Sequence, residues 1–119
     1  DMATAITPPR TDDQRHLALA KANHVRSTRA AYKTALRTAR DPWVMAEGIL
    51  RDPPAELRTM KVLEFMVAVR MIGPVKSRQI LAISMVSPAK TLGGLTERQR
   101  GVVADWFKSR SDRSSGGQS

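Results

Sequence analysis

Six cations recur along residues 11–40 at spacings that bring them to one side of a helix. At about 100° per residue, their side chains project within an arc of roughly 80°. The six are Arg15, Arg26, Arg29, Lys33, Arg37 and Arg40. At ~1.5 Å rise per residue this row is about 37 Å long, enough to follow a phosphate backbone. A solvated helix face is the alternative interpretation, but the face carries no interleaved acids, which favours phosphate contact.

A second candidate site is the turn around Gly73-Pro74. Glycine tolerates positive φ and proline suits the first position of a helix, so this pair would end one helix and open the next. Free backbone amides at the new helix start, together with Lys76 and Arg78, could bind phosphate without reading bases. Taken alone, such a turn is more often an ordinary helix connection.

The loop 90–94 is a third candidate. Lys90 supplies a cation, and Gly93 and Gly94 would let the backbone approach DNA closely. The loop lacks the Gly-Lys-Ser/Thr order of a nucleotide-binding P-loop, which argues against ATP use.

Several enzyme classes are excluded by what the sequence lacks. There is no cysteine, so disulfide scaffolds, thiolate zinc sites and cysteine nucleophiles are ruled out. His16 and His24 stand eight residues apart without a nearby carboxylate cluster, and no serine stands in a nucleophile elbow. We therefore expect neither enzymatic activity nor a bound metal or cofactor.

The overall charge points to a polyanionic partner. The chain has 119 residues, with 20 Lys and Arg against 11 Asp and Glu, a formal net charge of +9 and a sequence pI of about 11.1. Nucleic acid is the first candidate and an anionic membrane surface the second. No apolar stretch is long enough to cross a membrane and no secretory leader opens the chain, so a cytoplasmic protein is expected.

Apolar residues recur at three- and four-residue spacing, which predicts an all-α fold. A capping box that begins at Thr11 starts a long helix over 11–40, and Asp41-Pro42 starts a short one. Thr59 is expected to cap a buried central helix, and a second capping box at Thr96 starts the last helix.

These signals divide the chain into three parts. Residues 1–10 and 109–119 are expected to be flexible ends, and 11–108 a single helical domain. Four methionines are expected to fill its core: Met60, Met66, Met71 and Met85.

Several short motifs, in their order and spacing, resemble the actinobacterial integration host factor family of mycobacteria and streptomycetes. The similarity extends from about Thr11 to Phe107. Its motifs are Thr11-Asp12-Asp13-Gln14-Arg15, Arg29-Ala30 with Lys33, Met60-Lys61-Val62, Ile72-Gly73-Pro74-Val75-Lys76, Leu92-Gly93-Gly94-Leu95 and Arg98-Gln99-Arg100.

The resemblance implies a long N-terminal helix packed on a helix-two-turn-helix domain similar to that of ribosomal protein S13, here over 59–108. It implies a non-enzymatic, nucleoid-associated bacterial protein that binds duplex DNA with little sequence specificity and can support site-specific recombination beside an integrase; the departures from the family pattern would also suit a phage-encoded copy. We expect a monomer. The implied DNA-binding residues add Lys61, Arg98 and Arg100 to those already named. One departure is Pro74, which stands where the family usually has a lysine.

Two other function classes stay open at this point. A basic helix on an S13-like domain also suits RNA, as in a ribosome-binding module. Alternatively, the face of the first helix could dock an acidic protein partner, which would make the chain an adaptor.

Overall fold

The computed structural model describes residues 11–116. Within this range the chain is helical, with one isolated antiparallel bridge between Lys61 and Thr91. The elements in chain order are α2 (Asp12–Thr38), α3 (Pro42–Arg51), η1 (Ala55–Leu57), α4 (Val62–Ala68), α5 (Gly73–Ile83), η2 (Leu92–Gly94) and α6 (Glu97–Gly116). The expected all-α class is confirmed.

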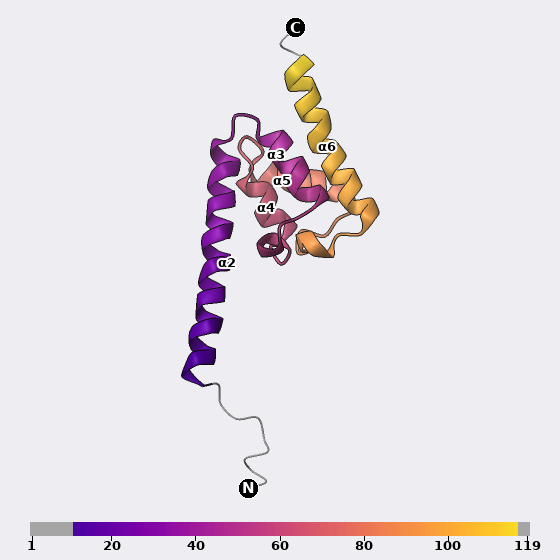
Figure 1. The fold of residues 1–119 in the computed structure, drawn as a ribbon. Coiled ribbons are helices and arrows are strands. Elements are labelled where there is room, and N and C mark those ends of the chain that lie inside the picture. Colours follow the sequence, from indigo (N-terminus) through magenta and orange to yellow (C-terminus); the bar gives the residue numbers. More distant parts are fainter. Residues whose placement is uncertain (1–10, 117–119) are drawn as a thin grey trace.

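The long helix α2 begins at the expected capping box. The backbone amide of Gln14 donates to Thr11 Oγ1 at 3.1 Å, and the amide of Thr11 donates to Gln14 Oε1 at 3.0 Å. Almost every residue from Asp12 to His24 is exposed, and Leu36 is the buried residue of the helix. The first half of α2 therefore extends beyond the rest of the molecule (Figure 1).

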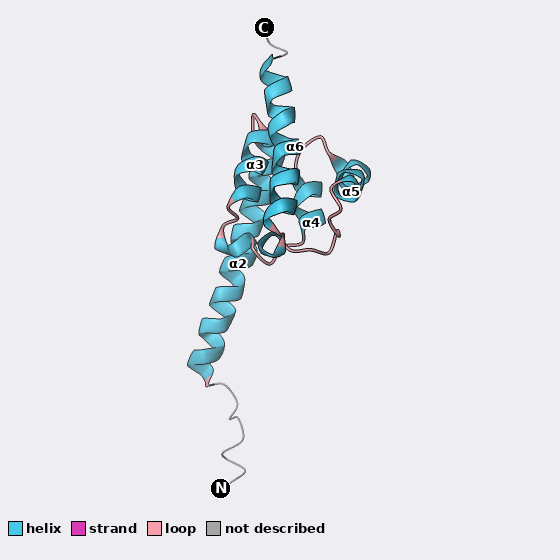
Figure 2. Cartoon of the chain, turned by 90° about the vertical axis from the view of Figure 1, so that its right-hand side faces the viewer, coloured by secondary structure: helices cyan, strands magenta, loops and turns pink. Residues whose placement is uncertain are grey.

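The remaining elements, α3 to α6, form what we call the body. Its core includes Phe65 and Met66 of the central helix α4, which lies between α2 and α5 (Figure 2). Helices α3 and α6 pack together through an aromatic cluster of Trp43, Trp106 and Phe107. In the part of the chain described, no helix has the length and apolar character needed to cross a membrane.

An ion-pair link also joins α3 to α6 at the surface. Arg51 donates to Asp105 at 2.9 Å and to Glu47 at 2.8 Å. The hydrogen bond to Asp105, followed by that to Glu47, raises the pKa of the Arg51 guanidinium above its ordinary value.

The predicted starts of α3 and α6 are confirmed. Asp41 Oδ1 accepts from the amides of Trp43 and Val44 at 3.1 and 3.2 Å. Thr96 and Gln99 form the second capping box, with distances of 3.0 and 3.1 Å.

Two predicted boundaries are wrong. Thr59 does not cap α4, because its hydroxyl accepts a hydrogen bond from Arg29 and the helix begins only after Lys61. The last helix does not give way to a flexible tail at Ser109 but continues to Gly116; Ser111, a buried residue of this extension, donates to Asp41 at 3.3 Å. The expected flexible residues 1–10 and 117–119 lie outside the described range.

The methionine prediction is half right. Met60 and Met66 are buried, but Met71 and Met85 are 79% and 75% exposed. Both exposed residues adopt positive φ, +76° and +59°, where the chain turns on either side of α5. These turns point the two side chains into solvent, which the spacing of apolar residues could not indicate.

Candidate nucleic-acid interface

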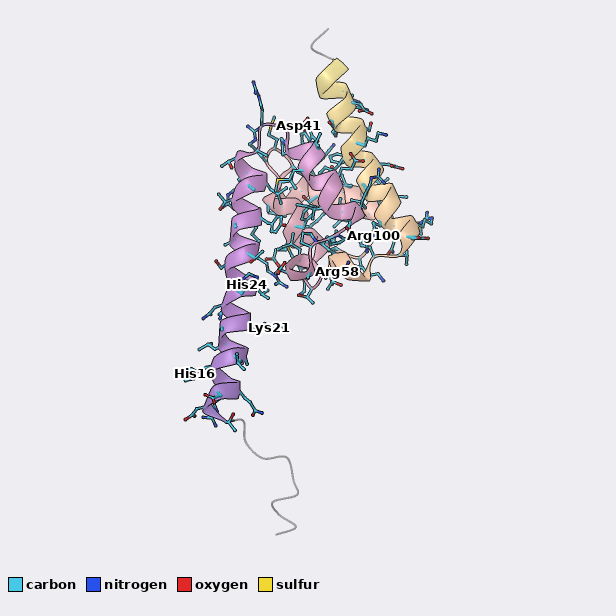
Figure 3. All side chains as sticks on the ribbon, viewed as in Figure 1. His16, Lys21, His24, Asp41, Arg58 and Arg100 are labelled. Atoms are coloured by element: carbon cyan, nitrogen blue, oxygen red, sulfur yellow. The ribbon has the colours of Figure 1, made fainter. Side chains whose placement is uncertain are left out.

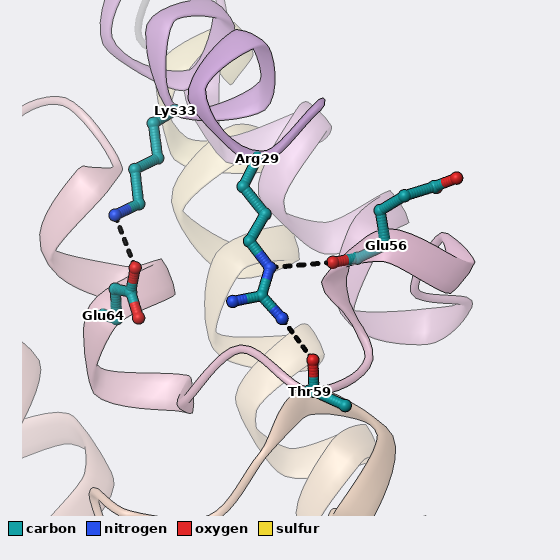
Figure 4. Close-up of polar contacts among 5 residues, drawn as sticks. All are labelled: Arg29, Lys33, Glu56, Thr59 and Glu64. Carbon is teal, nitrogen blue, oxygen red and sulfur yellow. Dashed lines mark hydrogen bonds and ion pairs between the residues drawn. The ribbon is translucent and has the colours of Figure 1, made fainter. Parts of the chain in front are cut away.

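The middle of the cationic row on α2 faces the body rather than solvent. Arg29 Nε donates to the carbonyl oxygen of Glu56 at 2.9 Å, and its Nη2 donates to Thr59 Oγ1. One turn later, Lys33 pairs with Glu64 of α4 (Figure 4). The prediction that all six cations form one free face is therefore wrong for Arg29 and Lys33, which hold α2 on the body.

The other four cations of the row are exposed. Arg15 lies 4.0 Å from Asp12, Arg26 donates to Asn23 at 2.7 Å, and Arg37 donates to Thr34 at 3.3 Å, all within one turn of α2. The fourth is Arg40, just after the helix. These side chains stay at the surface, where a phosphate could replace their local partners.

The imidazoles of α2 lie along its protruding half, as Figure 3 shows for His16 and His24. His24 Nε2 lies 3.3 Å from Glu56 Oε2, so this histidine marks the point where α2 meets the body. Within residues 11–116 there is no group of three or more metal-ligating side chains.

Backbone pairing brings three cations of the body together. The amide of Val62 donates to the carbonyl of Lys90 at 2.7 Å, and the amide of Gly93 donates to the carbonyl of Arg58 at 2.8 Å. We call Arg58, Lys61 and Lys90 the bridge cluster. Arg58 and Lys61 are exposed and Lys90 is half-buried. Sequence reasoning missed Arg58, because only the pairing of two distant loops places it there.

A groove of about 570 Å³ adjoins the bridge cluster. It lies between α2, α4 and the loop that follows α5. Lys33, Arg37 and Lys61 contribute to its edge, and most of the remaining lining is apolar. Those remaining residues are Leu63, Glu64, Val67, Ala68, Pro88 and Ala89. The groove thus connects the cations of α2 to those of the bridge cluster.

The loop glycines serve the packing of this region. A Cβ on Gly93 would lie 3.1 Å from both the Cβ and the carbonyl oxygen of Arg58. The Gly94 amide donates to Thr91 Oγ1 at 3.1 Å, and a Cβ there would lie 2.8 Å from the same oxygen. Both glycines therefore make close approaches within the protein, Gly93 to Arg58 and Gly94 to the Thr91 hydroxyl.

Arg100 also has an internal role. Its guanidinium donates to the carbonyl oxygens of Leu50 and Leu92 at 2.8 Å each and of Leu95 at 3.2 Å. Arg100 is half-buried, whereas Arg98 is exposed. Of this predicted pair, Arg98 is therefore the one whose charge is free to meet a ligand.

The turn before α5 has the geometry expected of it. Gly73 adopts a φ of +75°, and its carbonyl oxygen accepts from the buried Ser77 hydroxyl at 2.7 Å. Lys76 and Arg78 are both exposed on α5. We call Arg40, Gly73, Lys76 and Arg78 the turn group.

Arg40 joins the turn group through Arg70. The Arg70 guanidinium donates to the carbonyl oxygens of Ala39 at 2.9 Å and Arg40 at 3.4 Å, and its amide donates to Leu36 at 3.3 Å. Arg70 thereby ties the end of α2 to the start of the turn. Nothing in the spacing of residues along the chain indicates this role.

No protein-family model matches the chain, but two curated proteins do. The integration host factor of Mycobacterium tuberculosis is 33% identical over 104 residues, covering 86% of this chain and 96% of the relative. That of Mycolicibacterium smegmatis is 32% identical over 102 residues, covering 84% and 94%. A solved structure of sIHF bound to an 8-bp palindromic DNA superposes with a TM-score of 0.62 at 22% identity, covering 73% of this chain and 97% of that one.

Proposed function

The chain belongs to the integration host factor family, and we propose that it is a non-enzymatic architectural protein that binds duplex DNA with low sequence specificity. One observation carries this proposal: the bridge cluster and the turn group, whose cations are exposed except for the half-buried Lys90, lie at opposite ends of α4. The sIHF structure, which shares this fold, holds DNA. Exposed cations suit contact with phosphates, which positions a protein on the duplex without reading its sequence.

Affinity would come chiefly from neutralised phosphates, and sequence preference from the shape and stiffness of the duplex. The cations that we assign to phosphate contact are Arg15, Arg26, Arg37, Arg40, Arg58, Lys61, Lys76, Arg78, Lys90 and Arg98. Because Arg29, Lys33 and Arg100 are engaged within the protein, we assign them to the fold.

We further propose that the protein acts as a monomer at the nucleoid. Its two cationic groups and the protruding half of α2 would let one molecule restrain a bend in DNA. A restrained bend brings distant DNA sites close to each other, and an integrase needs such sites side by side during site-specific recombination.

The test is binding of the purified chain to a labelled duplex of random sequence across a salt series, with double-stranded RNA alongside. Lys61→Ala combined with Lys90→Ala probes the bridge cluster, and Lys76→Ala probes the turn group. We expect each lost phosphate contact to reduce the slope of log affinity against log salt by about 0.9. The matched control is Lys108→Ala, an exposed cation of α6 beside Asp105 and Asp112, which should leave affinity and slope unchanged.

Failure of the folded wild-type chain to bind duplex DNA at low salt would contradict the proposal. Tighter binding to double-stranded RNA than to DNA would contradict it too, and would favour the ribosome-binding alternative.

A further inference from the structure

Met71 has an apolar side chain that the fold exposes to solvent. It is 79% exposed, although it lies only one residue from the buried Ile72. Its backbone adopts a φ of +76°, a region that non-glycine residues other than Asn and Asp seldom occupy. Such conformations are found mainly where the surrounding structure enforces them, commonly at ligand-contacting sites.

The backbone on both sides of Met71 is anchored. On one side, Arg70 is tied to the end of α2 by three hydrogen bonds to backbone carbonyls. On the other side, the Ile72 amide donates to the carbonyl of Val69 at 3.4 Å, and Ser77 donates to Gly73 at 2.7 Å. Met71 is thus presented on a short turn whose neighbours are fixed.

The charges around Met71 suit DNA. Arg40 lies next to the turn through its carbonyl bond to Arg70, and Lys76 follows in the first turns of α5. Val75, 70% exposed, adds a second apolar side chain to the same turn. An apolar tip between phosphate-binding cations matches the arrangement by which minor-groove proteins insert Met, Leu or Phe between base pairs.

We propose that Met71 is a wedge residue that enters the minor groove, partly unstacks one base step and kinks the duplex. This inference rests on the proposed function and deepens it, because it gives the bend a structural origin. Unstacking is easiest at flexible pyrimidine–purine steps, so the wedge would give the protein a preference for TpA steps without any hydrogen bond to a base.

The chain supplies a matched control in Met85. This methionine is 75% exposed at a φ of +59°, at the other end of α5. No Lys or Arg stands between Arg78 and Lys90 in the sequence, and the Met85 carbonyl accepts from Gln99 Nε2 at 3.4 Å, so Met85 lies beside the start of α6 rather than the end of α2. The two residues therefore differ in the elements that surround them while sharing chemistry, exposure and backbone conformation.

The experiment uses a short duplex with a single TpA step, 2-aminopurine at its adenine and a donor–acceptor pair on its ends. With the wild-type chain we expect energy transfer between the ends to rise, because the duplex bends, and 2-aminopurine fluorescence to rise, because the base unstacks. Met71→Ala should lose most of both signals while affinity falls by less than about tenfold, since phosphates supply most of the binding. Met71→Leu should keep both signals, and Met85→Ala should match the wild type.

The wedge proposal would be overturned if Met71→Ala bent and unstacked the duplex as much as the wild type does. Wild-type binding without any unstacking would overturn the wedge alone, whereas absence of DNA binding would overturn the proposed function itself. Loss of both signals in Met85→Ala would also overturn the wedge, because bending and unstacking would then not depend on the turn that carries Met71. Circular dichroism and the unfolding midpoint of each variant check that the fold is intact.

Discussion

At the scale of single residues, three arginines that look alike in the sequence act on the protein's own backbone. Arg29, Arg70 and Arg100 each donate to carbonyl oxygens of other segments. Carbonyls at helix ends lack partners within their helix, and a planar guanidinium can satisfy several of them at once. A row of charges in a sequence therefore contains both ligand-binding and structural members, and spacing alone does not separate them.

Arg100 is the arginine whose loss should destabilise the fold most. Arg100→Met would leave the carbonyls of Leu50, Leu92 and Leu95 without this donor. Since hydrogen bonds to charged groups are worth about 1.5–3 kcal/mol each and are not additive, we expect the free energy of unfolding to fall by about 2–4 kcal/mol in urea denaturation. The exposed Arg98→Met should change it by no more than about 0.5 kcal/mol; equal effects of the two would refute the structural role.

Pro74 offers a gain-of-function test at the same scale. It is exposed in the first turn of α5 and, as a proline, has no amide to donate. Pro74→Lys adds a cation and a backbone donor beside Gly73, so DNA affinity should increase and the salt slope should steepen by about 0.9. Pro74→Ala, which restores the amide without the charge, is the control and should leave the slope unchanged.

At the scale of helices, the starts that depend on adjacent residues could be predicted. Thr11, Asp41 and Thr96 cap their helices because cap and amide lie within three residues of each other. The role of Thr59 could not be predicted, because its hydroxyl accepts a hydrogen bond from Arg29, thirty positions earlier in the chain. The length of α6 was missed for a related reason: the Ser- and Arg-rich sequence after Phe107 gives little helix signal, while Ser111 contacts Asp41.

The attachment of α2 to the body is measurable. Lys33→Glu should weaken the docking, since it faces Glu64, and Lys33→Glu with Glu64→Lys should recover it. Both side chains are partly exposed, so the coupling free energy should be only about 0.2–1 kcal/mol. A double-mutant cycle followed by thermal unfolding gives this value, and absence of coupling would mean that α2 is held by Arg29 and Leu36 without the ion pair.

The two halves of α2 should differ in stability. Residues 12–23 are almost all exposed, and a helix this short is marginal without tertiary contacts. Hydrogen exchange should therefore be fast in 12–23 and slow in 29–38 for the free protein, and DNA should slow exchange in the first half if Arg15 and Arg26 bind phosphate. Uniform protection along α2 without DNA would contradict this expectation.

At the scale of the whole molecule, the protein is elongated, with extents of 74 × 28 × 23 Å. Helices α2 and α6 extend toward opposite ends of the molecule (Figure 1), and Arg15, Arg26 and Arg37 are exposed residues of α2. At ~3.4 Å per base pair, the long axis spans about 22 base pairs and the short axes about 7 or 8. We expect one molecule to occlude nearer 20 base pairs at saturation; a site size near 8 in a reverse titration would mean that α2 lies across the duplex.

The resemblance to a family predicted the architecture of the whole molecule but not the distribution of its charges. Arg29 and Lys33 stand in one of the motifs that predicted the family, and in this structure they contact the body. Which cations reach solvent is decided by the angle at which α2 packs on α4, and that angle depends on contacts between distant residues.

The aromatic cluster between α3 and α6 gives the protein an intrinsic tryptophan fluorescence signal that reports on the body. Both tryptophans of the chain, Trp43 and Trp106, lie in it with ring centroids 6.2 Å apart, and Arg110 lies 4.8 Å from the Trp106 ring centroid. Neither tryptophan belongs to the bridge cluster or the turn group. Indole emission should therefore follow unfolding of the body and remain nearly unchanged when DNA binds, so the two processes can be recorded in one sample without any attached dye on the protein.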